Sequence, residues 1–374
     1  MLLFFVCVAL VVYFVMGYPL VLAFLARRKA KPVANGLELR TASFIIPVHN
    51  GARFLRRKLE SILALDYPRQ LIEILVVSDG STDETKEIAV EFAAAGVQLL
   101  LIPRSGKAAA LNSAVPRLSG EILILTDVRQ DLEPQSLRFL TAPFHDRNVG
   151  VVSGELILRA GDTQSEADVG LYWRYESWIR RNLSALDSMF GATGPFYAIR
   201  RELFRPIPED ILLDDVYLPM SAFFSGYRLI VEPRALAYDY PMTRQREFDR
   251  KVRTLGGNYQ LLFRMPRLLT FRNRLLWHFL SYKVGRLLLP WLILLTFAAS
   301  LKLPAPWNAV VVGIQLFFCV LALLDSSVPQ RSLLKRLSSP ARTFLVLMAA
   351  TVKGLKVLFV PPRALWKVTD IASD

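Results

Sequence analysis

Two long apolar stretches, one near each end of the chain, limit most strongly what this sequence can fold into. Residues 1–26 contain no charged side chain, and a second apolar region begins near Leu275. At about 1.5 Å per helical residue, the first stretch is long enough to cross a hydrocarbon core of about 30 Å. The region between them, Ser43 to Asp239, has the mixed composition of a globular domain. We therefore expect an integral membrane protein that carries one water-soluble domain.

The basic residues beside the first stretch predict its orientation. They follow the apolar run, at Arg27, Arg28, Lys29 and Lys31. A cleaved signal peptide would carry its positive charge before the apolar run instead. Because basic flanks stay on the cytoplasmic side, we expect a transmembrane helix over residues 1–30 with its N-terminus outside. The globular domain, residues 40–265, is then cytoplasmic, at a bacterial-type inner or plasma membrane.

Residues 270–374 are expected to contain an interfacial helix, transmembrane helices and a C-terminal tail. Asn273–Pro290 mixes aromatic and basic residues, which is typical of a helix in the membrane interface. Leu287–Leu301 and Trp307–Leu324 predict a hairpin of spanning helices. The basic segment Gln330–Arg342 predicts a cytoplasmic loop. Thr343–Val360 contains two lysines, and the sequence leaves open whether it spans the membrane or lies at its surface.

The net charge of +14 limits the classes of partner. It suits a membrane protein that faces anionic lipid headgroups, and it is compatible with an anionic small molecule. Nucleic-acid binding would require a recognised module or basic and aromatic residues interleaved on one face, and the sequence has neither. The two cysteines, Cys7 and Cys319, lie in apolar stretches and predict neither a disulfide framework nor a metal site.

Between Ser43 and Asp239, short β-rich runs alternate with segments of helical spacing. The predicted strands are Ser43–Pro47, Glu73–Val77, Gln98–Pro103, Glu121–Thr126 and Val149–Ser153. The predicted helices between the first four are Gly51–Leu65, Asp83–Ala95 and Lys107–Leu118, with further helices at Asp162–Leu186 and Thr243–Leu262. This order predicts an α/β domain with a doubly wound, mostly parallel sheet. Ligands of such sheets bind at the carboxyl ends of the strands.

Charged residues follow three successive predicted strands. Asp79 ends the second strand, where a carboxylate can accept hydrogen bonds from a nucleobase or ribose, and Thr82 or Asp83 can cap the next helix. After the third strand, Gly106 and Lys107 open a helix, an arrangement that favours anions but lacks the remaining residues of a Walker motif. The fourth strand ends at Asp127. Each residue alone also fits a solvated turn, but together they predict one crevice.

Two further groups of charged residues lie downstream. Asp214 and Asp215 follow an apolar run, where Asp214 is placed to cap a helix and Asp215 to face the crevice. Arg250 and Arg253 share one face of a helix, and arginine suits bidentate phosphate recognition. A basic cytoplasmic face near lipid is an equally simple interpretation of the two arginines.

In this order, the motifs from Ser43 to about Gln260 resemble the membrane-integrated family-two glycosyltransferases. That group has a GT-A fold and includes cellulose, chitin and hyaluronan synthases and ceramide glucosyltransferases. The resemblance implies an inverting transferase that uses a nucleotide sugar, with UDP-sugars as the first candidates. It also implies a divalent metal, Mg²⁺ or Mn²⁺, as cofactor.

The resemblance also implies roles for individual residues. Asp127 corresponds to the metal-binding acid and Asp215 to the general base of the family's acidic pair. The residues implied at the donor are Pro47, Asp79, Lys107 and Asp127. Those implied at the acceptor are Gly191, Thr193, Gly194 and Asp214, and the catalytic residues implied are Asp215, Arg250 and Arg253.

The sequence departs from the family pattern at two positions. Arg129 stands where the family has its second metal acid, and Thr254 stands where its Gln/Arg-x-x-Arg-Trp motif has Trp. Asp127 is then the single carboxylate expected on the metal, which Mg²⁺ tolerates because phosphate oxygens and water complete its shell. Arg129 is expected to contact phosphate or to pair with Asp131. The missing Trp argues against processive polymer synthesis.

Two classes of function follow from these observations. The first is an enzyme that transfers a sugar to a polysaccharide or lipid-linked acceptor at the cytoplasmic membrane face. The second is a catalytically degenerate membrane sensor or scaffold that binds a nucleotide or sugar, a hypothesis motivated by Arg129 and Thr254. A transporter is poorly supported, because the expected spans are few and ionisable residues in them are rare.

Overall fold

The structure, a computed structural model, describes residues 1–36, 38–158, 164–240, 244–329 and 332–362. The chain forms two compact units. The sheet unit comprises Leu25–Gly161 and Ser177–Pro241, and the helical unit comprises Met1–Phe24, Asp162–Glu176 and Met242–Asp374. Some predicted features fall outside the described residues. They are the N-terminal ends of the helices predicted from Asp162 and Thr243, the first residues of the predicted loop Gln330–Arg342, and the end of the C-terminal tail.

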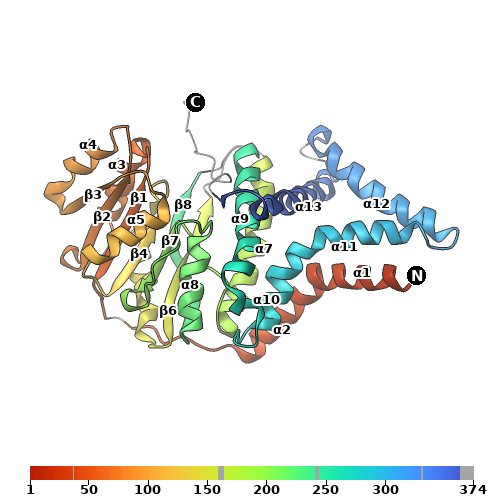
Figure 1. The fold of residues 1–374 in the computed structure, drawn as a ribbon, viewed down its shortest axis with the longest axis horizontal. Helices are drawn as coiled ribbons and strands as arrows, with labels where there is room; N and C mark the ends of the chain where they lie inside the picture. The colour runs from red at the N-terminus through yellow and green to blue at the C-terminus, as the bar shows by residue number, and fades with distance from the viewer. Residues whose placement is uncertain (37, 159–163, 241–243, 330–331, 363–374) are drawn as a thin grey trace. The chain divides into compact units, whose positions relative to one another are not determined.

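The sheet unit is built on one eight-stranded sheet with the order β3-β2-β1-β4-β7-β6-β8-β5 (Figure 1). Its strands are β1 (Ala42–Val48), β2 (Ile72–Asp79), β3 (Val97–Ile102), β4 (Ile122–Thr126), β5 (Asp131–Leu132), β6 (Val149–Leu158), β7 (Phe196–Arg200) and β8 (Arg228–Asp239). Neighbours are parallel across β3-β2-β1-β4 and between β6 and β8, whereas β7 runs antiparallel to β4 and β6, and β5 to β8. The sheet is mixed and mostly parallel, as predicted.

The five strands predicted from the sequence correspond to β1, β2, β3, β4 and β6. The strands β5, β7 and β8 were not predicted. Five-residue β7 pairs Leu125 of β4 with Tyr197 and Val152 of β6 with Ala198. Its place in the sheet depends on partners distant in sequence, which a local alternation pattern does not reveal.

Helices cover both faces of this sheet. On one face, α5 (Lys107–Ala114) and α8 (Asp214–Phe224) share an apolar core with strand residues, including Leu111, Leu218 and Tyr197 (Figure 1). The other face carries α3 (Ala52–Leu63), which reaches Thr126 of β4 through Lys58. The remaining helices of the sheet unit are α4 (Thr85–Glu91), α6 (Ser136–Thr141) and the C-terminal part of α7 (Gln164–Leu186). Lys107 and Asp214 are therefore the first residues of two helices on the same face.

Among the described residues, three helical stretches are long and apolar enough to cross a membrane, and all but residues 25–29 of the first belong to the helical unit. They are Leu2–Lys29, Leu276–Ser300 and Trp307–Ser327. Their helices are α1 (Leu2–Val12), α2 (Tyr18–Lys29), α10 (Leu276–Phe279), α11 (Gly285–Ser300) and α12 (Trp307–Leu323), and π-helical turns join α1 to α2 and α10 to α11. Within this unit α1 packs against α11, and α9 (Arg244–Arg264) packs against α13 (Lys335–Gly354).

Two segments of the helical unit differ from the sequence prediction. The predicted interfacial helix Asn273–Pro290 continues without a break into the helical stretch that ends at Ser300. Its polar residues find partners inside the unit: Arg286 pairs with Glu176 at 2.8 Å, and His278 Nδ1 lies 3.2 Å from the Tyr18 hydroxyl. The predicted loop Gln330–Arg342 is helical from Lys335, and both Lys335 and Arg342 pair with Asp325.

Candidate functional site

Lys107 joins two parts of the chain that the sequence predicted to meet. Its ammonium lies 3.0 Å from Asp127 Oδ1, at the end of β4, and 3.2 Å from Asp214 Oδ2, at the start of α8. Burial acts to lower the pKa of Lys107, but the charges of Asp127, Asp214 and Asp215 outweigh it, so the pKa lies above its ordinary value. The result is one permanent cation among three carboxylates, with negative charge in excess.

Asp79 lies at the end of β2 and is 3% exposed. Its carboxylate accepts the backbone N–H groups of Ser105 at 2.6 Å and of Gly106 at 3.0 Å, and it pairs with the guanidinium of Arg104. Asp79 thereby orders the turn that leads into Lys107. A nucleoside N–H group that binds this carboxylate has to displace Arg104, because the backbone donors hold the remaining acceptor positions. The proposed donor role of Asp79 stays a prediction.

The segment Gly191–Gly194 packs against the first turn of α8. The N–H of Ala192 donates to the carbonyl of Asp215 at 2.7 Å. Gly191 has a φ of +124°, and a Cβ atom there would lie 2.7 Å from Val216 Cγ2. A Cβ atom on Gly194 would lie 2.9 Å from Asp215 Oδ2. The positive φ requires glycine at 191, and a Cβ atom at 194 would displace the Asp215 carboxylate, so the predicted acceptor segment and the predicted base form one packed structure.

Two buried hydroxyl groups in this region have no hydrogen-bond partner among the residues that the structure describes. They are Thr193 Oγ1 and the hydroxyl of Tyr197, whose side chains are 5% and 0% exposed. Burial, together with the charges of Asp214, Asp215 and Asp127, raises the pKa of Tyr197, which therefore stays protonated. Unpaired buried hydroxyls are rare in folded proteins. Both unpaired hydroxyls lie in the part of the sheet unit where the charge of Asp215 also acts.

Asp127 is the residue that the sequence predicted to hold a metal ion. Within the described ranges, no three His, Cys, Asp or Glu side chains are grouped to bind one. The Asp127 side chain is 39% exposed and presents carboxylate oxygens, the donor type that Mg²⁺ and Mn²⁺ prefer. The excess negative charge around Lys107 also favours a cation. The residues present thus fit a divalent ion that diphosphate oxygens and water share with Asp127.

Arg129 follows Asp127 where the family pattern has a second acid. The sequence suggested phosphate or Asp131 as its partner. In the structure Arg129 pairs with Asp239, at the end of β8, and Asp131 pairs with Arg57 at 2.8 Å. Gln130 Nε2 also donates to Asp239, at 2.9 Å. The arginine therefore anchors the chain that follows Asp127 to β8, a contact between residues 110 positions apart.

The other predicted site residues are placed differently. Pro47 lies within β1, half-buried and opposite Val77, and no described contact assigns it to a ligand. Arg250 and Arg253 lie on α9, in the helical unit, where Arg250 makes two hydrogen bonds with Glu247 at 2.9 Å and stacks on Trp173. Their catalytic roles stay predictions.

Three residues at this edge of the sheet were not singled out from the sequence: Lys58, Arg104 and Tyr197. Arg104 follows the third predicted strand, and ligands of parallel sheets bind at the carboxyl ends of the strands, so its position could have identified it. Lys58 lies among Leu55, Leu59 and Ile62 on the apolar face of α3, and a lysine on such a face is itself a signal. For Tyr197 the sequence has no comparable signal, because β7 was not predicted.

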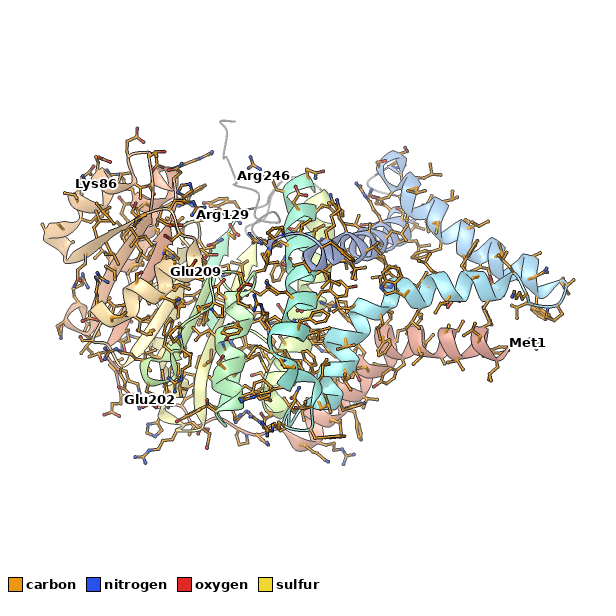
Figure 2. All side chains as sticks on the ribbon, viewed as in Figure 1. Met1, Lys86, Arg129, Glu202, Glu209 and Arg246 are labelled. Carbon is orange, nitrogen blue, oxygen red and sulfur yellow. The ribbon has the colours of Figure 1, made fainter. Side chains whose placement is uncertain are left out.

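Figure 2 places Arg129 and Glu202 at opposite ends of the sheet, with the candidate site at the Arg129 end.

Comparison with known proteins gives independent findings. Residues 43–207 match the family model described as glycosyl transferase family 2. The chain is 24% identical over 243 residues to the probable glycosyltransferase YdaM of Bacillus subtilis (strain 168), covering 62% of this chain and 58% of that protein. It is 23% identical over 242 residues to the poly-β-1,6-N-acetyl-D-glucosamine synthase of Staphylococcus aureus (strain COL), covering 63% and 58%. The alignments thus span less than two thirds of these relatives.

Among solved structures, the chain resembles the mannosyltransferase PcManGT from Pyrobaculum calidifontis, in complex with GDP-Man and Mn²⁺. The TM-score is 0.74 at 24% identity, over 96% of this chain and 99% of that one. The likeness confirms the predicted fold: a GT-A sheet domain combined with N-terminal and C-terminal helices that are long and apolar enough to span a membrane.

Proposed function

Since this chain carries a domain of glycosyl transferase family 2 at residues 43–207, we propose that it transfers a sugar from a nucleotide sugar to an acceptor hydroxyl, with inversion at the anomeric carbon. The observation that carries this proposal is the meeting of Asp127, Lys107 and Asp214 at the carboxyl end of β4. The charge of Asp215 acts on the same lysine. This chemistry requires a carboxylate that binds a metal ion, a cation that binds phosphate and a general base that deprotonates a hydroxyl.

In the proposed mechanism, Asp127 and Lys107 act on the donor diphosphate. A divalent ion bound with the diphosphate would neutralise charge on the leaving group. Asp127 would hold that ion, and Lys107 would turn from the carboxylates toward phosphate oxygens. Three carboxylates around one lysine disfavour a bare diphosphate, so donor and metal are expected to bind together.

Asp215 is proposed as the general base. It accepts the proton of the acceptor hydroxyl while that oxygen forms a bond to the anomeric carbon and the bond from this carbon to the diphosphate breaks. The contacts of Gly191–Gly194 with the first turn of α8 support this role, because the N–H of Ala192 holds the Asp215 carbonyl and Gly194 has no side chain of its own beside the Asp215 carboxylate.

The membrane arrangement and the acceptor are part of the same proposal. We place residues 1–30 as a membrane helix, residues 40–265 as the catalytic domain on the cytoplasmic side, and residues 270–374 as further interfacial and membrane helices. A polysaccharide hydroxyl is favoured over a lipid-linked acceptor, because one curated relative is a poly-β-1,6-N-acetyl-D-glucosamine synthase. Partition of labelled product between polymer precipitate and organic solvent separates the two acceptors.

The test combines a donor screen with one substitution. Membranes that contain the protein are incubated with UDP-sugars and GDP-sugars, with and without Mn²⁺, and sugar transfer is measured. For the donor that the wild type uses, Asp215→Asn is expected to lower turnover by about 10²- to 10⁴-fold, the usual contribution of a general base. Binding of the nucleoside diphosphate should not be weakened, because the substitution removes one of the negative charges that act on Lys107.

Glu202→Gln serves as the control, since it removes an exposed acid at the other end of the sheet from the candidate site (Figure 2). If Asp215→Asn keeps most of its turnover, the assignment of the base is wrong. If the wild type transfers sugar from no donor in the presence of metal, the proposed function itself is wrong.

A further inference from the structure

Lys58 is a fully buried lysine on α3. Its side chain is 0% exposed and lies on the same helix face as Leu55, Leu59 and Ile62. An ammonium group is costly to bury unless hydrogen bonds replace its water shell. A methionine or leucine of similar size would fill the same space without that cost. The contacts of the Lys58 ammonium therefore indicate why a charged donor is present here.

The ammonium group connects the two ends of one short segment. Lys58 Nζ donates to Thr126 Oγ1 at 2.7 Å and to the carbonyl oxygen of Gln130 at 2.7 Å. We call Thr126–Gln130 the Asp127 segment, because it carries Asp127 between these two contacts. No apolar side chain can bind two oxygen atoms in this way. Lys58 thus fixes the backbone on both sides of the acid proposed to hold the metal.

Thr126 also links Lys58 to Pro195, the residue after the segment Gly191–Gly194 that packs against Asp215. Thr126 Oγ1, which accepts from Lys58, donates to the carbonyl of Pro195 at 2.7 Å, and the N–H of Asp127 donates to that carbonyl at 3.3 Å. Pro195 directly follows Gly191–Gly194. One buried lysine is therefore hydrogen-bonded directly to the proposed metal-binding segment and, through Thr126, to the residue that follows the proposed acceptor segment.

We propose that Lys58 is a positioning residue that holds Asp127 in the geometry required for metal-dependent binding of the donor diphosphate. The inference rests on the proposed function. Lys58 contacts no substrate; it acts through the Asp127 segment. In the structure, Asp127 pairs with Lys107, and it would have to give up this contact to bind a metal ion. A fixed backbone would keep its carboxylate pointed in the same direction during that exchange. Residues that orient a metal ligand typically change metal affinity or activity by about 10- to 100-fold when removed.

The test is Lys58→Met, which keeps the volume and removes the donors. Titration calorimetry of the detergent-solubilised full chain measures the binding of UDP and of GDP, each with and without Mn²⁺. For the nucleotide that binds, the gain in affinity caused by Mn²⁺ should fall by about 10-fold or more. Metal-free binding should stay at the wild-type value, because Asp79 and Lys107 do not contact Lys58. With a donor sugar, KM should rise and kcat should fall, because the ion that Asp127 would hold both binds the diphosphate and neutralises charge on the leaving group.

Arg56→Met is the matched control. It removes a positive charge two positions before Lys58 on α3, where Arg56 pairs with Glu91 and both side chains are about half exposed. This variant should bind both nucleotides as the wild type does. Thr126→Val provides a second test in case Lys58→Met does not fold, because it removes the hydroxyl that accepts the hydrogen bond from Lys58. It should lower the Mn²⁺-dependent gain in the same selective way.

The outcomes are distinguishable. If both Lys58→Met and Thr126→Val keep the full Mn²⁺-dependent gain, Lys58 has no positioning role, and the proposed function is unaffected. If a variant loses metal-free and metal-dependent binding equally, Lys58 is only a structural residue and the inference is overturned. If the wild type binds neither nucleotide, the proposed function fails, and the inference fails with it.

Discussion

Lys58 and Lys107 show how strongly the surroundings of a side chain set its charge. Burial lowers the pKa of Lys58 to about 7, although Asp127 and Asp131 act in the opposite direction. Burial also acts on Lys107, but three carboxylates raise its pKa above the ordinary value. The difference lies in the partners: Lys58 bonds to neutral oxygens, and Lys107 to carboxylates. Proximity to acids therefore keeps the lysine at the candidate site protonated.

The unpaired hydroxyl of Tyr197 leads to a prediction on stability. Because this buried group has no partner among the described residues, Tyr197→Phe removes no hydrogen bond and is expected to leave the unfolding midpoint unchanged or to raise it by a few °C. Thermal unfolding of the detergent-solubilised protein, followed by intrinsic fluorescence, measures this.

Tyr67→Phe is the comparison variant, since the Tyr67 hydroxyl accepts from the N–H of Arg40 at 2.8 Å and donates to its carbonyl at 2.7 Å. This substitution should cost about 1–3 kcal/mol, because it leaves both backbone groups without their partner. An equal loss of stability in the two variants would show that the Tyr197 hydroxyl is paired in the folded protein.

At the scale of elements, the turn after β2 holds two helices through one carboxylate. Asp83 accepts the N–H of Ala52, the first residue of α3, at 2.9 Å, and the N–H of Thr85, the first residue of α4, at 3.2 Å. The sequence predicted Asp83 as a cap for the second helix only. Negative charge at a helix N-terminus is favourable, and here it serves two helices at once.

Asp83 also gives a prediction on pH dependence. Desolvation acts to raise the pKa of its carboxyl, but the hydrogen bonds from Thr85 and Ala52 outweigh it and hold the pKa below the ordinary value. A depressed folded-state pKa means that the charged form stabilises the fold above about pH 4, and that this contribution is lost as the pH falls through the folded-state pKa.

The substitution Asp83→Ala is therefore expected to cost about 1 kcal/mol at pH 7, a value typical of lost helix caps. Unfolding midpoints of wild type and variant, measured from pH 7 down to pH 3, should converge on the acid side. A difference that stays constant over this range would contradict the proposed role of the ionised carboxylate.

At the scale of the whole molecule, segments rich in basic residues alternate with apolar helices along the chain. Among the described residues, three helical stretches are long and apolar enough to span a membrane, and the first of them ends in the basic residues Arg27, Arg28 and Lys29. The connection between α11 and α12 has one basic residue, Lys302, whereas α13 begins with Lys335 and Arg336. This distribution predicts that Lys302 lies outside and Arg336 in the cytoplasm.

Cysteine labelling tests this arrangement. In a Cys7→Ser, Cys319→Ser background, single cysteines replace Lys302 or Arg336, which are both exposed. A membrane-impermeant maleimide should label Lys302→Cys in intact spheroplasts and Arg336→Cys only after the membrane is permeabilised. The opposite pattern would place the catalytic domain outside the cytoplasm and exclude a cytosolic nucleotide-sugar donor.

The fold class and much of the candidate site were predictable from the sequence, because the relevant signals are local. Alternating strands and helices imply a parallel sheet, and its geometry brings strand ends to one edge. Lys107 and Asp127 were predicted to meet on this ground, and the structure places them in contact. The apolar stretches were equally visible, since the length of an apolar run is a property of consecutive residues.

The tertiary structure alone decided which distant residues become partners. Strand β7 enters antiparallel between β4 and β6, and this arrangement brings Pro195 to Thr126 and Asp127. Arg129 pairs with Asp239 instead of the neighbouring acid that the sequence suggested, and Lys58 crosses from α3 to the end of β4. Local patterns determine which elements form and which of their faces are apolar. The pairing of polar groups depends on long-range packing, because a buried charge bonds to whatever the completed fold places beside it.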